Sequence, residues 1–170
     1  LVEFNCVKDC SQCCIEREYY PTKKFGKIVV LILPEEKERI EKLAIMNELK
    51  ITILPRIGIS EKNHSKPTKI LAYQLMGTEQ NGNTCPFLDK ETGTRAPNGG
   101  FPCKIYNKRP LACMTYPLIE SKPITLDQKC KFCKEHGSAD QNLNSEIESL
   151  LKIKTKMNTD APCIWRFATG

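Results

Sequence analysis

The sequence predicts a single α+β domain over residues 1–170, in which cysteine-rich loops close around one or two metal centres. Three observations predict this fold class. A chain of 170 residues, with 40% apolar and 27% charged residues, suits one globular domain with a hydrophobic core. A β-branched apolar run and an amphipathic helical pattern occupy different parts of the chain. Ten cysteines, four of them within the first fourteen residues, are well above the usual content.

The first half of the chain begins with a compact cysteine knuckle over residues 1–20. The run 25–33 is apolar and β-branched, which predicts a buried strand. Pro34 then opens a helix that we expect to reach about Lys50, because proline fits the first helical position. The two glutamates that follow this proline suit the positive end of the helix dipole.

Two further strands are expected at Ile51–Leu54 and Lys69–Met76. A polar loop, Gly58–Pro67, should connect them. The segment 77–84, with the sequence GTEQNGNT, predicts a turn.

The second half of the chain is loop-like from Cys85 to Pro117. Within it, Glu91–Pro102 is expected to be a flexible excursion. The segment Asp140–Met157 predicts a helix, and the tail Ala161–Gly170 predicts an edge strand. The expected apolar face of that helix consists of Leu143, Ile147, Leu150 and Leu151.

The N-terminal cysteines are spaced as Cys6-x3-Cys10-x2-Cys13-Cys14. Thiolates repel one another, so such a cluster needs a metal cation to neutralise it, or disulfide formation to remove the charge. A gap of two residues lets both sulfurs face one centre, which suits zinc and iron–sulfur clusters alike. Because successive side chains diverge, we expect Cys13 or Cys14 to ligate while the other serves a second centre or packs in the core.

A second group of cysteines follows at 85, 103 and 113, and a Cys-x2-Cys pair lies at 130–133. Arg109-Pro110 predicts the start of a short helix that carries Cys113 in its first turn, where a thiol pKa is lowered. We expect Arg109 to screen the thiolate charge, and Tyr106 and Tyr116 to pack around the centre. The candidate metal ligands are Cys6, Cys10, Cys13, Cys14, Cys85, Cys103, Cys113, Cys130 and Cys133, and Cys163 comes last.

These motifs resemble the CxxCxxCC cysteine-cluster family, described as zinc- or iron-chelating proteins. That family joins an N-terminal cysteine cluster to a downstream C-P-F-L and C-x-I-Y-x-x-R-P-x-x-C-x-x-Y-P signature. The resemblance spans about residues 6–133 and implies metal binding, and a related domain occurs in flagellin lysine methylases. The chain departs from the pattern by an x3 first gap and by an apparent insertion at 91–102. The matching residues are Cys85-Pro86-Phe87-Leu88, Cys103, Ile105, Tyr106, Arg109, Pro110, Cys113, Tyr116 and Pro117.

The cysteine content favours an iron–sulfur cluster, most simply [4Fe–4S], over zinc. Sulfur ligands suit both metals, but ten cysteines can supply two four-thiolate centres, and only two histidines are present. His64 lies in a polar loop as a surface residue, whereas His136 could extend the Cys130-x2-Cys133 pair into a zinc site. A disulfide framework fits the tight spacing less well. The spacing also resembles the radical S-adenosylmethionine signature, but Gln12 replaces the aromatic residue before the third cysteine.

An iron–sulfur protein would act in electron transfer or in cluster-dependent modification. The alternative is a structural zinc module that presents a surface to a protein partner. The family relative adds a third hypothesis, protein lysine methylation with S-adenosylmethionine. The sequence assigns no catalytic residue and leaves open whether the protein is an enzyme, since phosphate loops, nucleophile elbows and HExxH motifs are absent.

The formal charge is +6, but no basic run alternates with aromatic residues, so no nucleic-acid partner is expected. The longest apolar run, Ile28–Leu33, is far shorter than the roughly 20 residues of a membrane-spanning helix. We therefore expect a soluble, cytoplasmic protein without a membrane partner.

Overall fold

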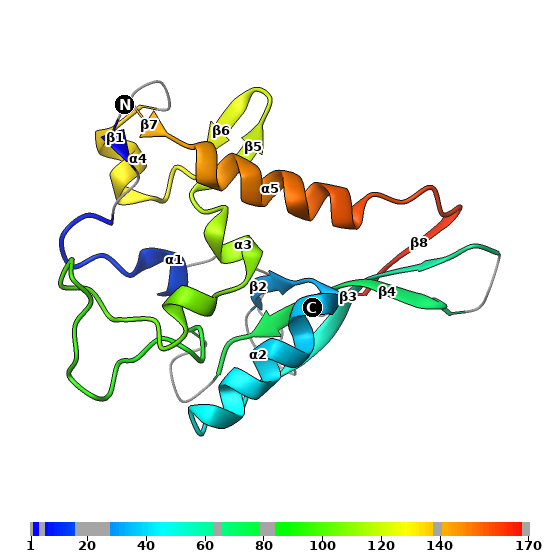
Figure 1. Ribbon diagram of the computed structural model, residues 1–170, viewed down its shortest axis with the longest axis horizontal. Coiled ribbons are helices and arrows are strands. Elements are labelled where there is room, and N and C mark those ends of the chain that lie inside the picture. The colour runs from blue at the N-terminus through cyan, green and yellow to red at the C-terminus, as the bar shows by residue number, and fades with distance from the viewer. Residues whose placement is uncertain are drawn as a thin grey trace.

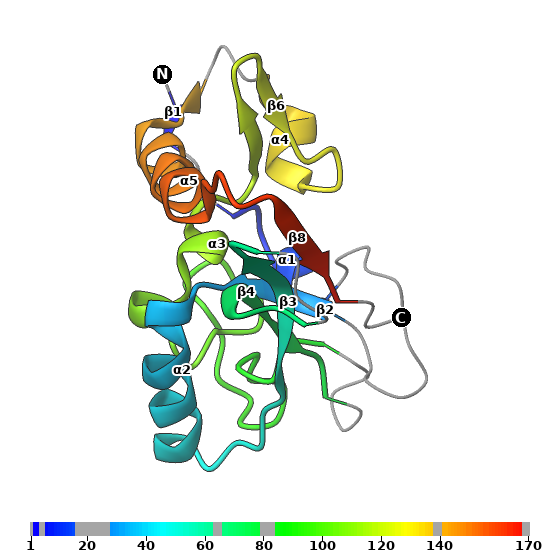
Figure 2. The same ribbon diagram turned by 90° about the vertical axis from the view of Figure 1, so that its right-hand side faces the viewer.

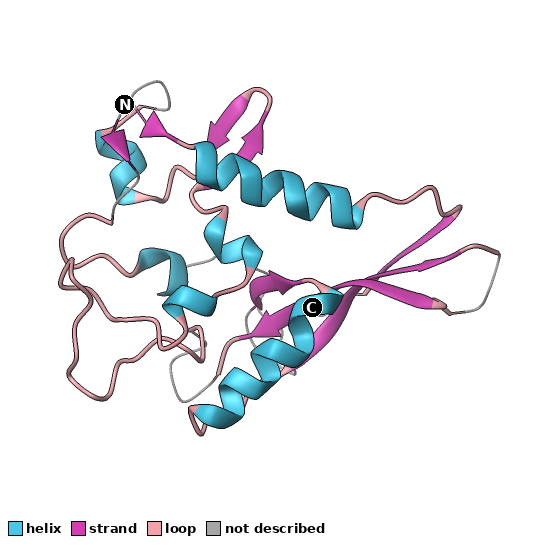
Figure 3. Cartoon of the chain, in the orientation of Figure 1, coloured by secondary structure: helices cyan, strands magenta, loops and turns pink. Residues whose placement is uncertain are grey.

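The computed structural model has the predicted α+β composition (Figures 1 and 3). The helices are α1 (Gln12–Ile15), α2 (Pro34–Met46), η2 (Tyr106–Lys108), α3 (Leu111–Met114), α4 (Lys131–Glu135) and α5 (Asn144–Met157). The strands are β1 (Val2–Glu3), β2 (Ile28–Ile32), β3 (Ile53–Ser60), β4 (Lys69–Met76), β5 (Leu118–Ser121), β6 (Ile124–Leu126), β7 (Gln141–Asn142) and β8 (Cys163–Arg166). The structure describes residues 2–3, 6–15, 28–62, 66–78, 84–137 and 141–167.

A four-stranded antiparallel sheet with the order β2-β4-β3-β8 forms the centre of the fold. Strand β2 confirms the predicted apolar strand, although residues 25–27 lie outside the described part of the chain. Strand β4 has the predicted bounds, Lys69–Met76. Strand β8 pairs with β3 at the end of the strand order, which confirms the predicted edge strand.

Strand β3 is longer than predicted and begins later. It includes Gly58–Ser60, where the sequence predicts a polar loop. Gly58 lies opposite Ile70 of β4 and Trp165 of β8, so pairing on both sides extends the strand through this glycine. A Cβ atom at Gly58 would lie only 2.6 Å from Cβ of Pro67, so close packing favours glycine here. His64 lies outside the described residues.

Helix α2 begins at Pro34, as predicted. Its buried face includes Ile40, Leu43 and Ala44, at the i, i+3 and i+4 spacing of a helix that packs against a core. The helix ends at Met46, about four residues before the predicted end near Lys50, and Glu48 takes a left-handed conformation with φ of 56°. In Figure 1, α2 lies at the bottom of the molecule and α5 near the top, with α3 and the sheet between them.

The main hydrophobic core joins the sheet and α2 to the cysteine-bearing loops. Half-buried Cys14, Cys103 and Cys113 pack against it, and Cys85 is one of its buried members. The other buried members are Val29, Val30, Ile32, Ile40, Leu43, Ala44, Leu75, Phe87, Leu88 and Ile105.

A second, smaller core lies between the β5–β6 hairpin and α5, near the top of Figure 2. Its buried members are Leu118, Leu126 and Leu143, with Ile147, Leu150 and Cys133 packed against them. Leu151 is 50% exposed, so its predicted place on the buried face of the helix was wrong. The helix starts at Asn144, later than predicted; Gln141–Asn142 form β7, and Asp140 lies outside the described residues.

The segment from Cys85 to Pro117 is mostly irregular, as predicted, apart from η2, α3 and an isolated bridge between Leu88 and Cys103. Glu91–Pro102 has no regular secondary structure, yet it is bonded along the N-terminal knuckle, so its description as a flexible excursion needs correction. Within the described part of the chain, none of the helices combines the length and apolar character that crossing a bilayer requires.

Candidate metal centre

Nine of the ten cysteines form one connected network of interacting thiols. Cys13 links three parts of this network, because Cys6, Cys14 and Cys103 all interact electrostatically with it. The nine are the candidates chosen from the sequence: Cys6, Cys10, Cys13, Cys14, Cys85, Cys103, Cys113, Cys130 and Cys133. Segments more than 100 residues apart therefore place their sulfurs in one region.

The knuckle, residues 6–15 in the described part, is shaped by two tight turns of the backbone. The amide of Cys10 donates to the carbonyl of Val7 at 3.1 Å, and the amide of Cys14 donates to that of Ser11 at 3.0 Å. The sulfurs of Cys13 and Cys14 lie 4.0 Å apart. The neighbours of Cys14 are Cys85 and Cys113, whereas those of Cys13 are Cys6 and Cys103, so the two adjacent thiols face largely different partners.

Burial and neighbouring thiols make Cys6 and Cys14 of the knuckle difficult to ionise. Desolvation, followed by repulsion from Cys13, Cys10 and Cys130, raises the pKa of Cys6 from 9.0 to about 11. A hydrogen bond with Cys13 and burial raise the pKa of Cys14 well above 9.0, and repulsion from neighbouring thiols adds to the effect. A nearby cation would reverse these shifts.

The Cys85–Cys103 segment is attached directly to the knuckle. The buried Cys85 donates its amide to the carbonyl of Cys14 at 3.2 Å. Burial raises the pKa of Cys103, but a hydrogen bond from the backbone N–H of Ile105 to its sulfur and the Arg109 guanidinium both oppose that rise. Arg109 also lowers the pKa of Cys6, which agrees with the screening role predicted for it.

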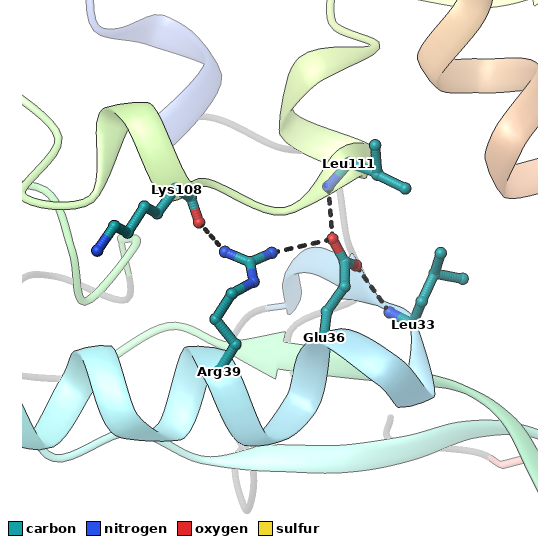
Figure 4. A network of polar contacts seen from close by, with 5 residues as sticks. All are labelled: Leu33, Glu36, Arg39, Lys108 and Leu111. Carbon is teal, nitrogen blue, oxygen red and sulfur yellow. Dashed lines mark hydrogen bonds and ion pairs between the residues drawn. The ribbon is translucent and has the colours of Figure 1, made fainter.

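Cys113 is carried by α3, which starts directly after Pro110, as predicted. A buried carboxylate holds this helix in place (Figure 4). Oε1 of Glu36 accepts the amide of Leu111 at 2.9 Å and Nη2 of Arg39 at 3.3 Å, while Oε2 accepts the amide of Leu33 at 3.0 Å. Arg39 also donates to the carbonyl of Lys108. This network fastens both ends of the Arg109-Pro110 turn to α2.

The pair Cys130–Cys133 lies at the start of α4. Burial and then repulsion from Cys130 raise the pKa of Cys133 to about 12, opposed by a hydrogen bond from the buried side chain of Gln141. The hydroxyl of Tyr116 donates to the Asp127 carboxylate beside this pair, and burial followed by that negative charge raises the tyrosine pKa. Tyr106 instead stacks under Arg109, with 4.1 Å between the guanidinium carbon and the ring centroid.

An open pocket of about 600 Å³ adjoins Cys6. Lys8, Lys131 and His136 contribute basic groups to its lining. The ring of His136 also packs on Phe132, with 4.5 Å between the centroids. The pocket gives solvent and small molecules access to the Cys6 side of the cluster, since Cys6 is exposed.

Cys163 lies in β8, opposite Ser60 of β3 and away from the interacting thiols described above. All ten cysteines are in the described residues, and no disulfide joins any of them.

The donor set of the network meets the chemical needs of a soft metal, although its geometry is not yet that of a metal site. In the residues that the structure covers, no three or more His, Cys, Asp or Glu side chains are already arranged to hold a metal ion. The chemistry of the donors nevertheless fits a soft cation: sulfurs gather, repel one another when ionised, and receive N–H bonds that favour thiolate. Metal binding deprotonates its ligands and orders them together, so a bound cation would bring these sulfurs closer to one another.

Sequence reasoning missed three residues that support the thiols: Asp127 and Gln141, which interact with Cys133, and Glu36, which holds the helix that carries Cys113. Glu36 carried a local signal only for starting α2, because its bond to Leu111 spans 75 residues. Asp127 and Gln141 stand in no recognisable motif, and their partners follow from the tertiary fold alone.

A comparison with protein families matches residues 5–134 to the family CxxCxxCC, described as "Putative zinc- or iron-chelating domain". Neither the curated proteins nor the solved structures contain a match to this chain.

Proposed function

Because the chain belongs to the CxxCxxCC family of zinc- or iron-chelating domains, which makes it a metal-binding protein, we propose that it carries an iron–sulfur cluster. The simplest form is [4Fe–4S], bound by cysteines of the knuckle and of the 85–113 segment. The observation that supports this most is the gathering of nine thiols into one network, from which the tenth cysteine stands apart.

Cys13 defines the first group of ligands that we propose. Its interactions with Cys6 and Cys103, together with that of Cys6 with Cys10, connect four thiols, the number that a [4Fe–4S] cluster uses. A second group, Cys14, Cys85 and Cys113, meets the first at the Cys13–Cys14 pair. Cys130 and Cys133 would supply either an additional ligand to one of these groups or the ligands of a second centre.

An iron–sulfur cluster supplies one-electron redox chemistry, so we propose electron transfer or cluster-dependent modification as the role. The residues of this chain would set its potential. The Ile105 N–H bond to Cys103 and the positive charge of Arg109 both favour ionised sulfur, and such contacts raise the potential of a cluster. The pocket beside Cys6 supplies a route for a redox partner or substrate.

One distance supports zinc as the second candidate. Two thiolates on the same tetrahedral zinc ion, with Zn–S bonds of about 2.3 Å, lie about 3.8 Å apart. The sulfurs of Cys13 and Cys14 are 4.0 Å apart, close to that value. A structural zinc site here would hold the knuckle shut and leave the surrounding surface for a protein partner.

Anaerobic purification followed by elemental analysis tests the proposal. An iron–sulfur protein contains iron and acid-labile sulfide and absorbs broadly near ~400 nm, with bleaching on reduction. Zinc with no such absorption would replace the iron–sulfur proposal by the zinc one. A protein that takes up neither metal after reconstitution would refute both.

Matched cysteine variants then identify the ligands. Cys13→Ser should lose most of the bound metal, whereas Cys163→Ser should keep all of it, because only Cys13 belongs to the network. Equal loss in both variants would contradict the assignment. Protein lysine methylation, the third hypothesis, requires S-adenosylmethionine binding, and a calorimetric titration without heat would remove it.

A further inference from the structure

We infer that the cysteine-free segment Glu91–Pro102, here named the clamp loop, positions the knuckle thiols and thereby sets how tightly the knuckle holds its metal. The inference rests on the proposed metal binding and deepens it. It assigns a role to Asn98 and Gly100, neither of which can bind a soft metal itself.

Asn98 closes the turn between the first two cysteines. Its Nδ2 donates to the carbonyl of Val7 at 2.9 Å and to that of Cys10 at 3.0 Å, so both amide protons are used. The backbone carbonyl of Asn98 accepts a hydrogen bond from the amide of Asp9 at 2.7 Å. Asp9 has φ of 57°, a left-handed conformation that aspartate tolerates. One asparagine therefore holds three backbone groups of the Cys6-x3-Cys10 turn.

Gly99 and Gly100 allow the clamp loop to approach the knuckle backbone. A Cβ atom at Gly100 would lie 2.3 Å from the carbonyl oxygen of Cys10 and 2.7 Å from Oγ of Ser11. Gly99 has φ of 89°, which L residues rarely adopt. Since the atom facing Gly100 is backbone, a side chain there must displace Cys10 itself.

A further contact reaches the turn between Cys10 and Cys13. The amide of Phe101 donates to Oγ of Ser11 at 2.6 Å, and this hydroxyl lies 3.3 Å from the carbonyl of Phe101. Phe101 also packs against the main core and lies under Arg95, with 4.4 Å between the guanidinium carbon and the ring centroid. The clamp loop thus connects the knuckle to the rigid centre of the protein.

The clamp loop is itself fixed by hydrogen bonds. At its base the amide of Asp89 donates to the carbonyl of Pro102 at 2.9 Å, and the Asp89 carboxylate accepts the amides of Glu91 at 3.2 Å and Thr92 at 3.1 Å. At its tip the amide of Ala96 donates to the carbonyl of Gly100 at 2.8 Å. An ordered loop can hold the knuckle in place before metal arrives.

The clamp loop therefore contacts the longest gap between successive cysteines of the knuckle. The gap between Cys6 and Cys10 is one residue longer than the gap between Cys10 and Cys13, and Asn98 of the clamp loop binds the backbone of that longer gap. A longer gap lets the sulfurs spread, which weakens a site unless another element restrains them. The clamp loop supplies that restraint.

The test compares Co²⁺ binding in wild type, Asn98→Ala, Asn98→Asp and Gly100→Ala. The sulfur-to-cobalt charge-transfer band counts bound thiolates, and competition with a chelator gives the affinity. Loss of contacts around ligands typically weakens metal binding by about 10–100-fold, so we expect at least ~10-fold for each variant, with a weaker band. The control is Gly93→Asn in the same loop, because a Cβ there meets nothing within 4 Å and asparagine tolerates its φ of 75°.

Unfolding of the metal-free variants separates positioning from general stability. If Asn98 positions the thiols, the urea midpoint of Asn98→Ala stays near that of Gly93→Asn, while the number of thiolates bound to Co²⁺ falls in Asn98→Ala. Wild-type affinity and band intensity in both Asn98 variants would overturn the clamp, as would an affinity loss that merely follows the midpoint. A wild-type protein that binds neither iron nor cobalt would instead refute the proposed function. If Gly100→Ala does not fold, the Asn98 variants still decide.

Discussion

Glu36→Ala should strongly destabilise the protein, although Glu36 is far from the thiols in sequence. The carboxylate is only 5% exposed and accepts hydrogen bonds from Leu33, Leu111 and Arg39. Its removal leaves the buried Leu33 amide and the first amide of α3 without their acceptor, and Arg39 without its counter-charge. An alanine at this position keeps the helix propensity of α2, so the loss comes from these contacts.

The magnitude follows from the number of stranded groups. A hydrogen bond to a charged acceptor contributes about 1.5–3 kcal/mol, and a buried donor left without a partner costs about 1–3 kcal/mol. Two backbone amides lose such a bond, so we expect the free energy of unfolding to fall by about 3–5 kcal/mol. Arg39 adds little to this loss, because its side chain is 41% exposed. For a chain of this length, that change lowers the melting temperature by roughly 6–20 °C.

Urea unfolding followed by circular dichroism measures this loss in the metal-free protein. The control is Glu38→Ala on the same helix, where the Glu38–Lys42 pair is exposed and should contribute little. A loss below about 1 kcal/mol in Glu36→Ala, or one no larger than in the control, would refute the reasoning. A second readout follows from the α3 attachment: Glu36→Ala should also bind metal more weakly, because α3 carries Cys113.

Three further predictions concern charge and metal. Metal uptake at pH 7 should release protons and strengthen as pH rises, because the ligand pKa values, about 11 for Cys6 and about 12 for Cys133, keep the thiols protonated. An indicator dye in weak buffer measures the released protons. Metal uptake without proton release would exclude thiol ligands. Removal of metal by a chelator should lower the urea midpoint of wild type but leave that of Cys13→Ser nearly unchanged, and equal shifts would argue for ligands elsewhere. A hydrogen bond from Lys154 lowers the pKa of Glu120 from 4.5 to about 2, so the stability that this ion pair contributes is present above pH 4.5 and is lost as the pH falls toward 2. Glu120→Gln should therefore be destabilising at pH 6 and neutral at pH 2. A difference in urea midpoint that does not depend on pH would contradict this.

Local signals predicted the elements that depend on local interactions. Pro34 and the spacing of Ile40, Leu43 and Ala44 suffice to predict α2, since a helix satisfies most of its hydrogen bonds within itself. Gly58 is in a strand although glycine locally favours a loop, because pairing with β8, about 100 residues later, imposes the strand conformation. Leu151 is a second example of a feature that the sequence does not determine. Helical periodicity predicts the apolar face of α5, but the neighbouring β5–β6 hairpin determines how much of that face is buried.

In the candidate site, too, some residues could be predicted from the sequence and others could not. Cysteine spacing and the C-P-F-L signature were enough to select the thiols that the structure brings together. The positions of Glu36 and Asn98 relative to those thiols were not predictable, because their partners lie 75 and about 90 residues away in sequence. Ordinary polar residues acquire such roles through tertiary contacts, which spacing does not encode.

The adjacent cysteines Cys13 and Cys14 indicate that the sulfurs of the network bind a cation and do not simply pack as apolar side chains. Cys13 raises the pKa of Cys14 across 4.0 Å, and the two thiols also interact with cysteines from different segments. If the sulfurs served only as small apolar side chains, nothing would favour placing Arg109 and the Ile105 N–H beside them, since both stabilise negative charge. Those two contacts favour thiolate in a place where neighbouring thiols oppose it. A bound cation resolves that conflict, because it neutralises the sulfurs and retains the benefit of both donors.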